Sequence, residues 1–340
     1  MHAARHLRQL RTVLAALLCL ALPISVSNAR PISDPAVIHA NSIRNGSIAY
    51  KEGYFGRGEN RLHYVEAGRG PLIILYHGFP SFWYSWFDQM EMLKTRYRVV
   101  AVDGLGGGMS AKPKQIDAYK IARLAAQVDQ LARHLNGENR FILMGHDWGA
   151  ALAFAFAQAY PKRLYAVVGF SAPPYNAFLD LVRNSPQQQA RSGYMQAFKK
   201  MTPKSLAAGG MAERIWQQAY SNLIAAGALS AAESDLFQQT LVDPETMNGG
   251  INWYRANVPE FSMISMANHW PRSNAKIVVP ALLIWGASDK VFVDDFVTML
   301  PRYAPDVEIA RLPGVNHWAT IEKPELANAA IEAFLRAKTP

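Results

Sequence analysis

The sequence predicts an α/β fold, in which a mostly parallel sheet carries helices on both faces and is interrupted by an inserted helical cap. Two observations support this prediction. Short apolar runs alternate with helical segments, and such alternation is typical of parallel sheets covered on both faces. From about residue 173 the pattern becomes helix-rich, with many Ala, Gln, Met and aromatic residues, and the alternation then returns. We therefore expect a first core segment over 30–172, a cap over 173–271 and a second core segment over 272–340.

The first 29 residues are expected to be removed from the mature protein. Three arginines precede an apolar run over 13–24, and small residues follow up to Ala29. This layout is typical of a secretory signal peptide. The apolar run is short for a membrane span, which argues against an anchor. We expect a periplasmic or secreted protein after cleavage near Ala29, with no stable membrane anchor.

Composition excludes several other classes of function. Cys19 is the only cysteine among 340 residues and lies within the signal peptide, so we expect neither a disulfide nor a cysteine metal site in the mature protein. The formal net charge is +9, yet no basic run is longer than Lys199-Lys200. Because nucleic-acid binding needs a concentrated basic patch or a recognisable motif, we expect no nucleic-acid partner.

The core elements follow from local patterns along the chain. Residues 30–46 hold several Pro and Asn residues and predict a loosely structured arm. Alternation over 47–55 and 61–67 predicts the two strands of a hairpin. Apolar runs predict further strands, and helical spacing predicts helices. The strands are expected over 71–76, 97–102, 141–144, 164–170, 278–285 and 307–312, and the helices over 86–93, 118–135, 150–159 and 324–337.

The central motif is Gly145-His146-Asp147-Trp148-Gly149, between an apolar run and an Ala- and Phe-rich segment. Strand, Gly-x-Asp-x-Gly and helix form the layout of a nucleophile elbow, whose sharp turn exposes one side chain. Flanking glycines avoid a Cβ collision in such a turn. A carboxylate there, with an ordinary pKa of about 3.9, can attack a saturated carbon and form an alkyl ester. Asp147 could instead only cap the helix, and the motif alone does not separate these interpretations.

Two more strand-end loops carry ionisable residues. Asp289 follows the predicted strand over 278–285, and His317 follows the strand over 307–312. Reactive groups of open parallel sheets lie on such loops, and the order nucleophile, acid, histidine is that of a hydrolytic triad. Taken singly, Asp289 could be a turn residue and His317 a surface histidine. Three loops in the correct order favour a catalytic site.

Residues from about 47 onward resemble the α/β-hydrolase superfamily, and within it the branch of epoxide hydrolases and haloalkane dehalogenases. This resemblance implies an α/β-hydrolase fold, with Asp147 as nucleophile, His317 as base and Asp289 as the acid that orients it. It also implies an oxyanion hole formed by the backbone N–H groups of Phe79 and Trp148. The motifs that carry it are His77-Gly78-Phe79-Pro80, Gly145-His146-Asp147-Trp148-Gly149, Trp285-Gly286-Ala287-Ser288-Asp289 and Gly314-Val315-Asn316-His317-Trp318.

Two tyrosines in the cap point to the reaction. An epoxide oxygen leaves poorly without a proton donor, and a tyrosine with a pKa of about 10 suits that role. Asn252-Trp253-Tyr254-Arg255 resembles the second tyrosine motif of epoxide hydrolases, and the stretch beginning Tyr194-Met195 resembles the first more loosely. Ordinary helix packing is the alternative for both tyrosines. The resemblance therefore implies an epoxide hydrolase that uses Tyr194 and Tyr254.

The remaining expectations concern partners and alternatives. We expect a small apolar epoxide and water as substrates, no metal or organic cofactor, and a monomer or homodimer. Trp148 and Trp253 are expected to line the substrate pocket, and His77 and His146 to flank it. A haloalkane or haloacid dehalogenase with the same triad is one alternative. Against it, Phe79 occupies the position of the usual Asn halide donor, and the stretch from Asp103 to Met109 lacks the arginines that would hold a substrate carboxylate. A non-catalytic binding or effector member of the fold is the other.

Overall fold

A computed structural model describes residues 33–265 and 269–339. The chain divides into two units, 1–33 and 34–340, and the elements below lie in the second. The predicted signal peptide and its cleavage near Ala29 lie outside the described residues and stay a prediction, which N-terminal sequencing of the mature protein would test. Within the described ranges, no helix has the length and hydropathy needed to cross a membrane.

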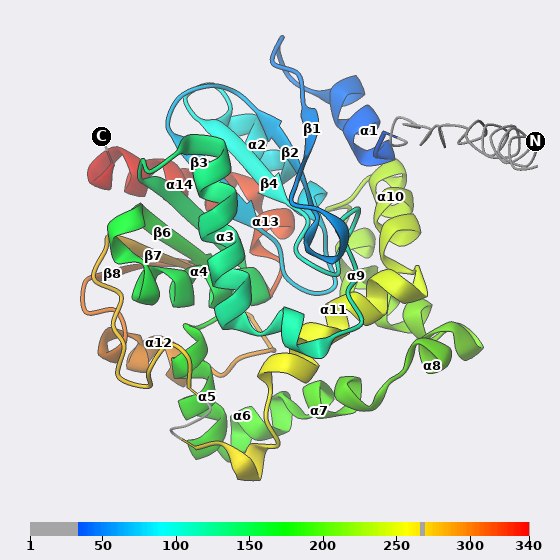
Figure 1. The fold of residues 1–340 in the computed structure, drawn as a ribbon, viewed down its shortest axis with the longest axis vertical. Coiled ribbons are helices and arrows are strands. Elements are labelled where there is room, and N and C mark those ends of the chain that lie inside the picture. Colours follow the sequence, from blue (N-terminus) through cyan, green and yellow to red (C-terminus); the bar gives the residue numbers. More distant parts are fainter. Residues whose placement is uncertain (1–32, 266–268, 340) are drawn as a thin grey trace, which may run out of the picture. The chain divides into compact units, whose positions relative to one another are not determined.

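A mixed sheet organises the second unit (Figure 1). The described residues form eight strands in the order β1-β2-β4-β3-β5-β6-β7-β8. β2 pairs antiparallel with β1 and with β4, and every other pairing is parallel. This is the predicted α/β sheet with its N-terminal hairpin. The strands are β1 Lys51–Phe55, β2 Leu62–Ala67, β3 Leu72–Tyr76, β4 Arg98–Val102, β5 Phe141–His146, β6 Leu164–Phe170, β7 Ala281–Gly286 and β8 Val307–Leu312.

Helices cover both faces of this sheet and fill the interval between β6 and β7. Helices α5 to α11 form that interval, within the range where the sequence predicts the cap. The helices are α1 Pro35–Ile43, α2 Phe87–Leu93, α3 Ile121–Asn136, α4 Trp148–Ala159, α5 Tyr175–Asn184, α6 Pro186–Arg191, α7 Gly193–Lys200, α8 Pro203–Ala207, α9 Met211–Ala225, α10 Ala231–Leu241, α11 Pro244–Asn257, α12 Asp295–Met299, α13 Ala319–Glu322 and α14 Pro324–Lys338.

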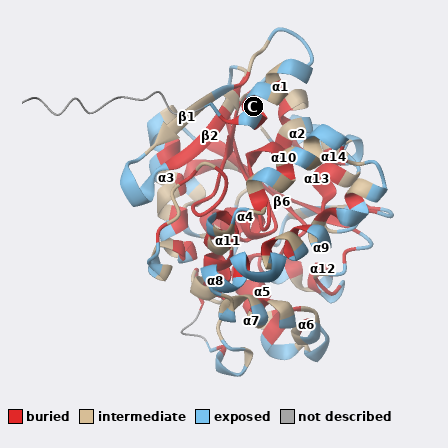
Figure 2. Ribbon diagram, turned by 90° about the vertical axis from the view of Figure 1, so that its right-hand side faces the viewer, coloured by how far each residue is buried: buried red, intermediate tan, exposed pale blue. Residues whose placement is uncertain are grey.

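Two hydrophobic clusters lie on opposite faces of the sheet. Side chains alternate between faces along a strand, so Ile74 of β3 belongs to the cluster under α3 and α4, whereas Ile73 and Leu75 belong to the cluster under α2, α13 and α14. Figure 2 shows the strands as mostly buried and the outer faces of the helices as exposed. The central strands are therefore covered on both sides, which explains their continuous apolar sequences.

The prediction of a loose arm over 30–46 is wrong in part, because residues 35–43 form helix α1. Asp34 caps the helix by accepting a hydrogen bond from the Ala36 backbone N–H, and Pro35 occupies the first turn. Both are known start signals for a helix. Val37 and Ala40 are buried against the core, so tertiary packing stabilises a helix that its Asn and Pro content obscures.

Candidate active site

The turn after β5 places Asp147 at the carboxyl end of the sheet. Asp147 has φ 52°, a left-handed conformation that non-glycine residues rarely adopt. A Cβ on either Gly145 or Gly149 would collide with backbone atoms, so this turn requires glycine on both sides. The sharp turn predicted from the sequence is therefore present, and Asp147 is the residue that it exposes.

The Asp147 side chain does not cap helix α4. It makes no capping hydrogen bond, and its Oδ1 instead accepts one of 2.9 Å from the backbone N–H of Phe79. Trp148 begins the helix, so its N–H is one of the donors that have no carbonyl partner within the helix. The capping interpretation is thus not supported, whereas the positions of Phe79 and Trp148 suit an oxyanion hole.

The three strand-end loops bring the predicted triad together. His317 Nδ1 lies 2.8 Å from Asp289 Oδ2, and His317 Nε2 lies 3.4 Å from Asp147 Oδ2. Asp289 also accepts a hydrogen bond from the Val291 backbone N–H through its other oxygen. His317 donates its Nδ1–H to Asp289, so its Nε2 faces Asp147. A histidine that acts as a base beside the Asp147 carboxylate needs this orientation.

Electrostatic coupling between His317 and its neighbours shifts the pKa values of the site. Burial alone would lower the pKa of His317, but the charges and hydrogen bonds of Asp289 and Asp147 raise it to about 10. Burial alone would raise the pKa of the Asp147 carboxyl, but His317 and the Phe79 N–H together hold it below its ordinary value. The free site is therefore an ion pair, with a carboxylate ready to act as a nucleophile.

The two cap tyrosines pack against each other, and Tyr254 packs on Trp148, the residue after Asp147. Tyr194 on α7 and Tyr254 on α11 have ring centroids 6.2 Å apart, and the Tyr254 ring packs edge-on against Trp148 at 5.2 Å. Burial raises the pKa of both hydroxyls, and the Asp147 charge raises it further. Both tyrosines are therefore protonated hydrogen-bond donors at neutral pH, and both lie within electrostatic reach of Asp147.

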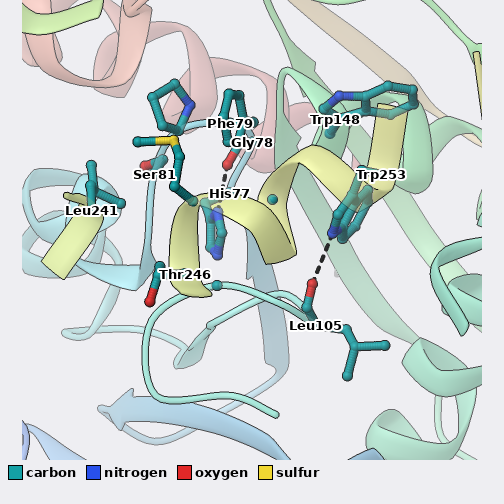
Figure 3. A pocket seen from close by; sticks show the side chains of 13 residues that line it. His77, Gly78, Phe79, Ser81, Leu105, Trp148, Leu241, Thr246 and Trp253 are labelled. Atoms are coloured by element: carbon teal, nitrogen blue, oxygen red, sulfur yellow. Dashed lines mark hydrogen bonds between the residues drawn. The ribbon is translucent and has the colours of Figure 1, made fainter. Parts of the chain in front are cut away.

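Two cavities meet at the Trp148 side chain. The Asp147 cavity encloses about 300 Å³, including its solvent-open part. The His77 cavity encloses about 380 Å³ and does not reach Asp147; Figure 3 shows His77 and Trp253 on its walls. Of these two cavities, the first borders the carboxylate, and its lining is almost entirely apolar. The Asp147 cavity is lined by Asp147, Trp148, Ala151, Ala172, Pro173, Phe178, Met195 and Phe292.

Three other predicted pocket residues have distinct places. His77 lines the His77 cavity but uses both ring nitrogens for hydrogen bonds to backbone groups. Trp253 lines the same cavity and donates its indole N–H to the Leu105 carbonyl. His146, which is expected to flank the pocket, is not among the residues that line either cavity. Its Nε2 donates a hydrogen bond of 2.8 Å to the His317 carbonyl oxygen, and burial lowers its pKa to about 4. His146 therefore contacts the backbone of His317.

A second buried group of ionisable residues was not predicted from the sequence. Asp34, His63 and Asp103 lie close enough together to hold a metal ion, and they are the one such group in the described part of the chain. Their carboxylates already accept hydrogen bonds from Ala36, Trp83 and Met109. The expectation that no metal is needed stays a prediction. Only the polar start of α1 and a lone His in β2 could have signalled the group.

Comparison with known proteins gives consistent likenesses. Residues 71–324 match the family described as the alpha/beta hydrolase fold. Epoxide hydrolase 4 of Mus musculus is 30% identical over 287 residues, which are 82% of this chain and 77% of that protein. Epoxide hydrolase 3 of the same organism is 31% identical over 281 residues, which are 81% and 74% of the two chains.

A solved structure shows the same fold. The Bacillus megaterium epoxide hydrolase in complex with an inhibitor superposes with a TM-score of 0.74 at 24% identity, over 84% of this chain and 100% of that chain. The family match over residues 71–324 includes all three loops that carry Asp147, Asp289 and His317. The likenesses therefore extend across the whole candidate site.

Proposed function

This chain belongs to the α/β-hydrolase family and, within it, to the epoxide hydrolases, and from that premise we propose that it opens an epoxide to a vicinal diol through a covalent ester on Asp147. One observation carries the proposal. The Asp147 carboxylate is held by the Phe79 N–H, is paired with His317, and acts electrostatically on two buried tyrosine hydroxyls. A nucleophile paired with a base and electrostatically coupled to two proton donors suits epoxide opening and ester hydrolysis.

The first step forms the ester. Asp147 Oδ2 attacks an epoxide carbon, because Oδ1 is already held by the Phe79 N–H. The C–O bond of the ring breaks, and the ring oxygen receives a proton from Tyr194 or Tyr254. An ionised oxygen is a poor leaving group, so this donation lowers the barrier, typically by 10²- to 10⁴-fold in rate for general acid catalysis.

The second step regenerates the carboxylate. Ester formation removes the negative charge of Asp147, which is one of the groups that raise the pKa of His317. His317 then loses its proton more readily. That proton returns to the tyrosinate formed in the first step and restores the tyrosine hydroxyl. Neutral His317, oriented by Asp289, takes a proton from water, which attacks the ester carbonyl. The N–H groups of Phe79 and Trp148 stabilise the resulting oxyanion, each contributing about 3 kcal/mol. The oxyanion then collapses, the bond from the ester carbon to the alkyl oxygen breaks, and the alkoxide takes the proton of the new carboxylic acid. This leaves the diol, the Asp147 carboxylate and protonated His317.

The tyrosine pair favours an epoxide over an organic halide. A halide leaves as a stable anion and needs no proton, so buried tyrosines beside the nucleophile would have no chemical role. Dehalogenation remains the alternative, since Trp148 borders the Asp147 cavity and could donate its indole N–H to a halide. The same carboxylate would attack in both reactions, and only the leaving group would differ.

The test compares wild type with His317→Gln on styrene oxide, a fatty-acid epoxide, 1-bromobutane and fluoroacetate. Wild type should release diol from the epoxides. His317→Gln should stop after the first step. Intact-mass spectrometry should then show a protein heavier by one substrate molecule, and peptide mapping should place the added alkyl group on Asp147. Halide release without diol would replace the proposal by dehalogenation. A wild type inactive on all four, with no mass increase in His317→Gln, would favour a binding role.

A further inference from the structure

One peptide unit of the oxyanion loop is held at both of its ends. Its N–H, on Phe79, donates to Asp147 Oδ1 at 2.9 Å. Its carbonyl, on Gly78, lies 2.7 Å from Nδ1 of His77, the contact drawn as a dashed line in Figure 3. A trans peptide is planar, and its C=O and N–H point in opposite directions. Whatever fixes the Gly78 oxygen therefore also fixes the direction of the Phe79 N–H.

The tautomer of His77 follows from its two partners. Nε2 lies 2.9 Å from the backbone nitrogen of Gly104, which can only donate. Nε2 must therefore be the acceptor, and Nδ1 carries the proton that it donates to the Gly78 carbonyl. The side chain is buried, and none of its hydrogen bonds goes to Asp147 or His317. His77 thus connects the oxyanion loop to the loop after β4 through a defined pair of bonds.

The loop after β4 is itself firmly anchored, so it can act as a fixed support. Asp103 is fully buried, and its Oδ2 accepts from the Met109 backbone N–H and lies 2.8 Å from Nδ1 of His63. Its Oδ1 accepts from the backbone N–H of Trp83. These bonds hold Asp103 from three directions, which leaves the neighbouring Gly104 N–H a fixed point for His77.

We propose that His77 is a positioning residue for ester hydrolysis: through the Gly78 carbonyl it aims the Phe79 N–H at the oxyanion that forms on Asp147. The inference rests on the proposed function, because an oxyanion on Asp147 arises only if an ester forms there. An oxyanion donor stabilises the transition state only when it is already oriented, since reorientation during the reaction would cost part of the gain. His77 supplies that orientation without touching the reacting atoms.

The experiment measures ester hydrolysis in single turnovers. Enzyme in excess over styrene oxide is quenched at successive times, and mass spectrometry follows the rise and decay of the Asp147 ester. His77→Phe keeps the ring but loses both hydrogen bonds, and its ester should decay on the order of 10²-fold more slowly than that of wild type. His77→Asn retains a donor at the position of Nδ1 and should recover part of this loss. His77→Gln retains only a group at the position of Nε2 and should recover less.

The decay rate separates positioning from a merely structural role. A structural loss would reduce the amount of folded enzyme, and therefore the amount of ester, but would leave the decay rate of each ester unchanged. A wild-type decay rate in His77→Phe would overturn the inference while leaving the proposed function standing. If His77→Phe does not fold, equal rates for the Asn and Gln variants would overturn it instead. A wild type that forms no ester would overturn both proposals.

Discussion

The protein contains the same charged arrangement twice, around His317 and around His63. In each, Nδ1 lies 2.8 Å from a buried aspartate, Asp289 in the first and Asp103 in the second. In each, Nε2 faces a second carboxylate, at 3.4 Å for Asp147 and 3.7 Å for Glu52. Neighbouring carboxylates raise the pKa of both histidines against the effect of burial. Distances and charges alone therefore do not distinguish a catalytic triad from a structural cluster.

What distinguishes the two is the space around the outer carboxylate. Asp147 lies on a left-handed turn, borders a cavity, accepts a hydrogen bond from the Phe79 N–H and acts electrostatically on the cap tyrosines. Glu52 lies on β1, and neither it nor His63 lines either of the two cavities. The His63 side chain is wholly buried, and the Asp34 backbone N–H donates a hydrogen bond to the Glu52 carboxylate. Both clusters hold a histidine between two carboxylates. The left-handed turn and the adjoining cavity are what make one of them a candidate active site.

Neutralising the carboxylate that faces Nε2 should therefore have different effects in the two clusters: loss of turnover at Asp147 and loss of stability at Glu52. Asp147→Asn removes the nucleophile and should lower turnover by at least about 10⁴-fold, a loss typical of triad members. Glu52→Gln, the matched change in the other cluster, should leave turnover per folded molecule unchanged. It should lower the free energy of unfolding by about 1 kcal/mol, because it weakens one partly buried hydrogen-bonded contact. Steady-state diol production and urea unfolding measure the two effects.

Active-site titration provides the control, since it counts the molecules able to form an ester. Substantial turnover by a stable Asp147→Asn protein would remove Asp147 from the role of nucleophile. A large loss of turnover in Glu52→Gln at full folding would show that the two clusters are not functionally separate.

In the cap, a similar comparison can be made between two buried tyrosines, Tyr254 and Tyr175. Burial and the Asp147 charge raise the pKa of Tyr254, whereas burial alone raises that of Tyr175, whose hydroxyl donates to the Asn257 carbonyl. Tyr254→Phe should slow ester formation by roughly 10²-fold, the lower end of general acid catalysis, because Tyr194 can still donate. Tyr175→Phe should leave that rate unchanged and cost about 1 kcal/mol of stability. Rapid-quench measurement of ester formation tests both.

The double variant Tyr194→Phe/Tyr254→Phe should be slower than either single variant. Equal rates of ester formation in wild type and the double variant would make both tyrosines packing residues. With unchanged rates on 1-bromobutane as well, that result would favour the dehalogenase alternative.

The three strand-end loops and the succession of strands and helices along the chain could be predicted from the sequence because each is a local pattern. The turn at Asp147 needs glycines two residues away on either side, and Asp289 and His317 lie in short loops after the predicted strands that end at Trp285 and Leu312. The His63 cluster could not be predicted in this way. In this cluster, His63 contacts Asp103, which lies 40 positions further along the chain. Nothing in the sequence around either residue indicates that the two meet.

The same limit explains the other differences. Helix α1 has its start signals in Asp34 and Pro35, but its stability comes from packing of Val37 and Ala40 on the core. The apolar wall of the Asp147 cavity combines Phe178, Met195 and Phe292 from three distant segments. Their chain neighbours do not show that they meet, because contacts between distant elements form only when the sheet and the cap assemble.

The smallest expected effect, and the sharpest comparison, is the response of the two histidines to pH. The pKa of His317 is raised from 6.5 to about 10, so the native state binds this proton more tightly than the unfolded chain. Its contribution to stability is therefore fully present below about pH 6.5 and is lost as the pH rises through about 10. Asp147→Asn removes one of the two charges that raise the pKa of His317 and should lower it, while the raised pKa of His63 should not move.

Nuclear magnetic resonance titration of the imidazole signals measures this difference directly. In wild type, His317 should remain protonated at pH 7, and in Asp147→Asn its titration should shift toward lower pH. The neutral amide stands in for the uncharged ester, so this shift reports the change that the proposed mechanism requires between its two steps. A His317 that is neutral at pH 7 in wild type, or one that does not respond to Asp147→Asn, would contradict charge coupling as the reason why His317 becomes a base only after the ester has formed.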